Sequence, residues 1–171
     1  MRALRLSVAA AMLVSVAGCA TPEKTSTGKE NEVATSEMKP DEALAALKKA
    51  SRELMAGIAP GVEFTEAGTN RAVPCGGPGG SEYSKVHLDF EGGLSAPASD
   101  PRVPQGEELF SKAESTLRRM GLEVRGRQRT PAGDGLVFAG DGFGGRIILH
   151  VQDAVMVRGQ TACLDNPDDL R

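Results

Sequence analysis

A histidine and two carboxylates stand at alternate positions of one short segment, residues 86–91. The polar members are His87, Asp89 and Glu91, and the residues between them are apolar, so the three polar side chains are expected on one face of a strand. Zinc and manganese both accept imidazole and carboxylate ligands. The plainer interpretation is the solvated face of a half-buried strand. A metal would need a further ligand, and His150 is the only other histidine.

Other patterns that carry chemistry are missing from the sequence. A phosphate-binding loop needs a lysine and a hydroxyl residue after its glycines, but the glycine-rich run 76–80 continues with Ser81-Glu82-Tyr83. The sequence has no Gly-x-Ser-x-Gly nucleophile motif, and the acidic run 165–169 lacks the twelve-residue calcium-loop pattern. We therefore expect no catalytic activity and no cofactor. A metal-dependent hydrolase using His87, Asp89 and Glu91 remains an alternative.

The N-terminus has the three zones of an export signal. Arg2 and Arg5 precede an apolar run, residues 6–16, which is shorter than the about 20 residues of a spanning helix. The run ends in Val16-Ala17-Gly18-Cys19, a tetrad that resembles the lipobox of bacterial lipoproteins. The resemblance implies that residues 1–18 are a signal peptide and that Cys19 becomes the lipidated first residue. A plain secretory signal is the alternative.

The lipobox resemblance also implies a location. The family's cysteine carries a diacylglyceryl group and often a third acyl chain, and two or more chains hold a protein stably on a membrane. We therefore expect a lipid-anchored protein on the extracytoplasmic face of the cell membrane. Its expected partners are membrane lipid at the anchor and, for the domain, an envelope protein or a cell-wall component.

Two further cysteines, Cys75 and Cys163, remain after Cys19 is assigned to lipid. Export would place them in a compartment where disulfides persist. The rival interpretations are a reactive thiol or a metal pair, but neither cysteine belongs to a Cys-x-x-Cys or Cys/His array. The sequence therefore predicts a structural disulfide between them.

Composition bounds the class of protein. The chain has 171 residues, a formal net charge of -3, 4% aromatic residues and no tryptophan. A nucleic-acid-binding protein would show a clustered basic face or aromatic stacking platforms, so that class is not expected.

Residues 19–38 are the lipidated cysteine and a polar tether that is predicted to be disordered, because it has scarcely any large apolar side chain to bury. Residues 39–165 form one α+β domain, and 166–171 an acidic tail.

Hydrophobic periodicity predicts the elements of this domain. One helix starts at Pro40 and ends before the breaker Ala59-Pro60-Gly61, and a second covers 107–120. Strands are predicted at 62–65, 86–91, 122–128, 135–139, 146–151 and 154–160, with a Pro/Ser/Gly-rich loop at 92–104. The order α-β-β-α-β-β-β-β, with its tight hairpins, favours a two-layer α+β sandwich. In it, both helices cover one face of a mainly antiparallel sheet.

A set of short motifs in a fixed order resembles a known family. The motifs are Ile58-Ala59-Pro60-Gly61-Val62-Glu63-Phe64, Cys75, the strand at 86–90, the helix ending at Gly121, the turn Gly140-Asp141-Gly142-Phe143, and Gly159-Gln160-Thr161-Ala162-Cys163-Leu164. They are similar to the mycobacterial LppA-type lipoproteins over about 43–164, although Phe64 stands where a tryptophan is expected. The resemblance implies an actinobacterial cell-envelope lipoprotein. It supplies no catalytic residue.

Three functions follow from these patterns. The first is a non-enzymatic domain that binds a partner or ligand at the cell envelope, which an anchored, tethered domain without a catalytic signature favours. The second is a carrier that holds a small apolar molecule or lipid between the helices and the sheet. The third is the metal-dependent hydrolase. Fold alone does not choose among them.

Overall fold

A computed structural model describes residues 38–129, 135–140 and 145–171. The predicted signal peptide, Cys19, and the tether up to residue 37 lie outside the described residues, as do residues 141–144 of the predicted glycine turn. Within the described ranges, neither helix combines the length and the apolar character that crossing a membrane requires. The elements are α1 (Pro40–Ile58), β1 (Phe64–Gly76), β2 (Glu82–Pro97), α2 (Gly106–Arg119), β3 (Glu123–Arg129), β4 (Gly135–Gly140), β5 (Arg146–Val151), β6 (Ala154–Gln160) and β7 (Leu164–Asp165).

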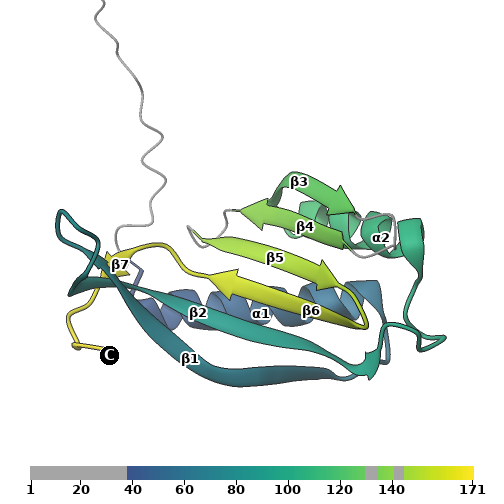
Figure 1. Cartoon of the computed structure of the whole chain (residues 1–171), viewed down its shortest axis with the longest axis horizontal. Helices are drawn as coiled ribbons and strands as arrows, with labels where there is room; N and C mark the ends of the chain where they lie inside the picture. Colours follow the sequence, from purple (N-terminus) through teal and green to yellow (C-terminus); the bar gives the residue numbers. More distant parts are fainter. Residues whose placement is uncertain (1–37, 130–134, 141–144) are drawn as a thin grey trace, which may run out of the picture. The chain divides into compact units, whose positions relative to one another are not determined.

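The strands form one seven-stranded sheet in the order β1-β2-β6-β5-β4-β3, with β7 paired to β2. Every described strand pair is antiparallel. Both helices lie on the same side of this sheet (Figure 1). The predicted α+β sandwich with its helices on one face is therefore confirmed, and the short strand β7 is an addition to the predicted order.

The core lies between the helices and the sheet. Helix α1 packs mainly on β2 and β6, whereas α2 packs on β3 and β4, and the two helices also touch each other. Apolar residues at helical spacing face alternate residues of the strands, as amphipathic elements require. The largest fully buried side chains are Phe110, Leu47, Leu54, Met55, Ile58, Leu109, Leu117, Ile147, Leu149, Val86, Val103 and Val137.

The helix ends are set by local chemistry. The backbone N–H of Lys39 donates a hydrogen bond to the Glu42 carboxylate (3.3 Å), and acidic residues occupy the first turns of both helices, where the helix dipole favours them. After α2, Gly121 adopts φ of 78°, and its N–H donates to the Arg118 carbonyl (3.0 Å). A left-handed glycine at this position is a common helix end, so Gly121 caps α2.

The first two strands are longer than predicted. The sequence predicts a strand at 62–65 and a loop at 92–104, whereas β1 continues to Gly76 and β2 to Pro97. The pairing of β1 with β2 shifts register between Ala67 and Arg71, and Gly68 between them has φ of 78°. A bulge of this kind breaks the alternation of apolar and polar residues, so the period-two pattern does not reveal the strand.

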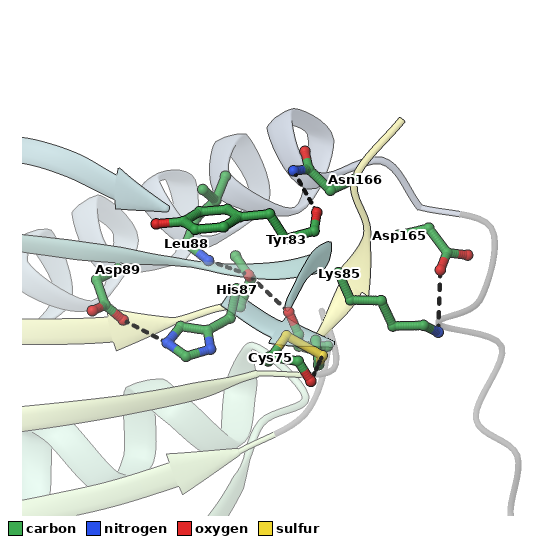
Figure 2. The surroundings of a disulfide bond; sticks show 11 residues. Cys75, Tyr83, Lys85, His87, Leu88, Asp89, Asp165 and Asn166 are labelled. Carbon is green, nitrogen blue, oxygen red and sulfur yellow. Dashed lines mark hydrogen bonds and ion pairs between the residues drawn. A yellow bond between two sulfur atoms is a disulfide. The ribbon is translucent and has the colours of Figure 1, made fainter. Parts of the chain in front are cut away.

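The predicted disulfide is present. Cys75, near the end of β1, is bonded to Cys163, which directly precedes β7, and their Cα atoms are 6.0 Å apart. Strand β2 pairs with β1 on one side and with β7 on the other. The disulfide therefore joins the two strands that flank the start of β2 (Figure 2).

The prediction of an acidic solvated tail at 166–171 is wrong at its first residue. Asn166 is buried, and its side-chain nitrogen donates to the carbonyls of Tyr83 (2.9 Å) and Leu170 (3.2 Å). Its side-chain oxygen accepts a hydrogen bond from the Leu170 backbone N–H (2.9 Å). One amide group thus links the C-terminal residues to the start of β2. The acidic composition of this segment does not indicate these hydrogen bonds.

Candidate functional site

The face of the sheet opposite the helices, here called the open face, carries the candidate site. Alternate residues of the central strands point to the core, and the residues between them form the open face. The open-face positions are His87, Asp89 and Glu91 on β2, Met156, Arg158 and Gln160 on β6, and Arg146, Ile148 and His150 on β5. The three candidates predicted from the sequence therefore do share one face.

Three adjoining depressions lined by described residues lie on the open face. The largest, about 390 Å³, is lined by Asp89, Phe90, Glu91, Arg146, Ile148, His150, Arg158, Gly159 and Gln160. A second of about 330 Å³ shares His150 and Arg158 with it and extends along β6 to Ala154. A third of about 210 Å³ shares Asp89 and Glu91 and reaches Arg71 on β1. Together they form a polar groove, hereafter the open-face groove.

Cross-strand pairs hold the polar side chains of this groove. Glu91 lies opposite Arg158 in the register of β2 and β6, and its Oε1 is 2.5 Å from the Arg158 Nε. Asp89 lies opposite Gln160, whose Nε2 donates to Oδ1 of Asp89 at 3.0 Å. Directly opposed residues of an antiparallel pair are close enough for such bonds. Both predicted carboxylates are therefore engaged by β6.

His150 contributes a partly buried imidazole to the same groove. Its Nε2 is buried and has no hydrogen-bond partner among the described residues. Burial lowers the pKa of the imidazole below its usual 6.5, and the positive charge of Arg158 lowers it further, whereas the Glu91 carboxylate opposes the shift. The neutral form of His150 therefore predominates near pH 7.

His87 lies apart from the groove lining, although it shares the open face. Its Nε2 is 3.7 Å from Oδ1 of Asp89, an ion-pair contact only when the imidazole is protonated (Figure 2). Within 38–129, 135–140 and 145–171, no set of three or more histidine, cysteine and acidic side chains is grouped so that it could hold a metal ion. The geometry therefore gives the proposed His87, Asp89 and Glu91 metal site no support.

Sequence reasoning found the β2 residues of the site and missed their partners. Arg158 and Gln160 lie opposite Glu91 and Asp89, and Arg146 lies opposite Gln160 on the next strand. The available signal was the alternation of β5 and β6, which places these residues on the non-core face. That alternation assigns a face, but it does not assign the strand order that brings β2 beside β6.

Comparisons with known proteins give a fold relationship. No protein-family model matches the chain, and no curated protein sequence matches it significantly. Among solved structures, a DUF4853 family protein from Actinomyces odontolyticus matches with a TM-score of 0.51 and 17% sequence identity. The match covers 77% of this chain and 71% of that one. At this identity the similarity concerns the fold.

Proposed function

We propose that the chain is an actinobacterial cell-envelope lipoprotein whose domain binds a polar ligand of the envelope in the open-face groove. Lipid on Cys19 would anchor it to the extracytoplasmic face of the cell membrane, with residues 20–38 as a tether. The observation that carries the binding role is the hollowed, polar sheet face that the helices leave uncovered. The anchoring role is carried by the lipobox pattern at residues 16–19.

Binding in the groove is favoured over transport of an apolar molecule inside the domain. A carrier of that kind needs an apolar cavity between the helices and the sheet. In the described residues, large side chains such as Phe110, Leu54 and Leu117 point into this layer and are fully buried. The three depressions lie instead on the opposite face and include charged side chains in their linings.

Groove binding is tested by filling the groove with one side chain. Ala154 lines the second depression, so Ala154→Arg would place a long side chain there. Ser111→Arg adds the same side chain to the exposed surface of α2, in the other layer, and is the matched control. The native protein and both variants are purified from detergent-solubilised membranes, and co-purifying proteins, glycans and lipids are identified by mass spectrometry.

The expected result is a defined species retained by the native chain and by Ser111→Arg and lost from Ala154→Arg. Equal retention by both variants would contradict the groove as the binding site.

Anchoring is tested separately by labelling cells with palmitate. Label should enter the native chain and be absent from Cys19→Ala, and label in both would contradict lipidation at Cys19.

A further inference from the structure

We propose that Arg146 and Arg158 form a subsite of the open-face groove that binds an oxoanion, either a carboxylate or a phosphoryl group. The inference rests on the function proposed above, since it names a chemical group that the ligand of the same groove would carry. Three features support it: the register of the two arginines, the guanidinium nitrogens that bond to no described residue, and the contacts that the neighbouring acidic side chains already make.

The register of β5 and β6 brings the two guanidinium groups to one depression. Ile148 lies directly opposite Arg158, and Arg146 lies opposite Gln160. Arg146 and Arg158 are therefore diagonal neighbours across an antiparallel pair, where Cα atoms are roughly 7–8 Å apart and long side chains meet. Both line the largest depression, and Ile148, an open-face neighbour of each, adds an apolar side chain to the lining.

The two arginines retain donors for a ligand. Glu91 contacts Nε of Arg158, which orients the guanidinium, and no described residue bonds to its terminal nitrogens. No hydrogen bond or ion pair within 38–129, 135–140 and 145–171 engages the guanidinium of Arg146. A guanidinium presents a planar fork of N–H donors that matches carboxylate and phosphate oxygens.

The charges around this subsite favour an anion rather than a cation. The acidic side chains of the largest depression are Asp89 and Glu91, and both are already bonded, to Gln160 and Arg158. Both lie on β2, so β6 separates them from Arg146. Asp89 keeps its negative charge, because Gln160 is neutral, but it lies on β2. Arg146 lies on β5 without an acidic partner among the described residues, so an oxoanion bound there would neutralise its charge.

The test is site-specific NMR of the arginine Nε–Hε groups in the full processed chain in detergent micelles. The probes are inorganic phosphate and acetate, with sodium chloride at the same ionic strength as the control for screening. Resonances of Arg146 and Arg158 should shift and saturate with at least one oxoanion. Arg146→Gln should weaken that binding by at least about tenfold because a charged fork of donors is lost. Arg102→Gln, in a turn where Arg102 pairs with Asp100, should leave it unchanged.

The outcomes separate this subsite from the proposed function. Tighter binding of phosphate identifies a phosphoryl ligand, and tighter binding of acetate identifies a carboxylate; either supports the subsite. Equal shifts in sodium chloride, or equal affinity in Arg146→Gln and Arg102→Gln, overturn it. If Ala154→Arg still abolishes ligand retention in that case, the groove function stands and only the oxoanion subsite is wrong.

Discussion

Gly159 of β6 and Leu47 of α1 share one space between the sheet and the helix. A Cβ atom built on Gly159 would lie 2.5 Å from Cδ1 of Leu47, well inside van der Waals contact. Leu47 is fully buried, so it has little room to move away. The missing side chain at Gly159 therefore allows α1 to approach the sheet beneath the open-face groove.

This close approach predicts the effect of one added methyl group. Gly159→Ala should lower the free energy of unfolding by about 1–3 kcal/mol, because the core must shift to accept the atom. Urea unfolding measures the change. Gly126→Ala is the control, since a Cβ on Gly126 in β3 meets nothing within 4 Å. Equal unfolding curves for both variants would show that the helix and sheet are not in close contact at Leu47.

The disulfide predicts a large stability difference between oxidised and reduced protein. Cys75 and Cys163 are 88 positions apart, and a cross-link over a loop of that length contributes about 4.6 kcal/mol in loop-entropy models. The Cys75→Ala/Cys163→Ala double variant should lose about that much stability in urea unfolding, and a reductant should not destabilise it further. Two free thiols titrated in the unreduced native protein would refute the pairing.

The Asn166 contacts predict that the C-terminal segment stabilises the domain. Asn166→Ala removes the donor to the Tyr83 carbonyl and both bonds with Leu170, and it should cost about 1–3 kcal/mol because buried backbone groups lose their partners. Asp168→Ala, at an exposed position two residues later, should change stability by less than about 0.5 kcal/mol. Equal losses of stability in the two variants would show that the loss does not come from the Asn166 hydrogen bonds.

The environment of His150 predicts a pH dependence of stability. Its pKa in the folded protein is below 6.5, chiefly through burial, so below about pH 6.5 the unfolded chain takes up a proton that the folded chain excludes. The free energy of unfolding should therefore fall as the pH is lowered from about 7.5 to about 5.5.

Two histidine variants assign that pH dependence. His150→Asn should remove this part of the slope, whereas His87→Asn, on the same face of the sheet, should retain it. Urea midpoints measured at several pH values across the range give the comparison. An unchanged slope in His150→Asn would show that the fall in stability does not come from His150.

The helices and the later strands could be predicted because their patterns are local. The strands at 146–151 and 154–160 have the predicted bounds, since apolar and polar residues alternate through both. The full length of β1 could not be predicted, because its bulge at 67–71 interrupts the alternation and its pairing with β2 depends on tertiary context.

The candidate site could also be predicted only in part. Alternation alone places His87, Asp89 and Glu91 on one strand face, and the structure agrees. It cannot assign Arg158 to Glu91, because these residues are far apart in the chain and meet only through the order of strands in the sheet. The local pattern therefore identified the β2 side of the groove, and the strand order supplied the β5 and β6 side, which carries Arg146 and Arg158.

The covalent link between Cys75 and Cys163 also affects how the domain would withstand proteolysis. A single cut at any peptide bond between these two residues opens the backbone but leaves both pieces joined through sulfur. The pieces would also remain paired in the sheet, since strands on either side of most such cuts are neighbours. A nicked copy would thus run as one molecule on a gel until a reductant is added.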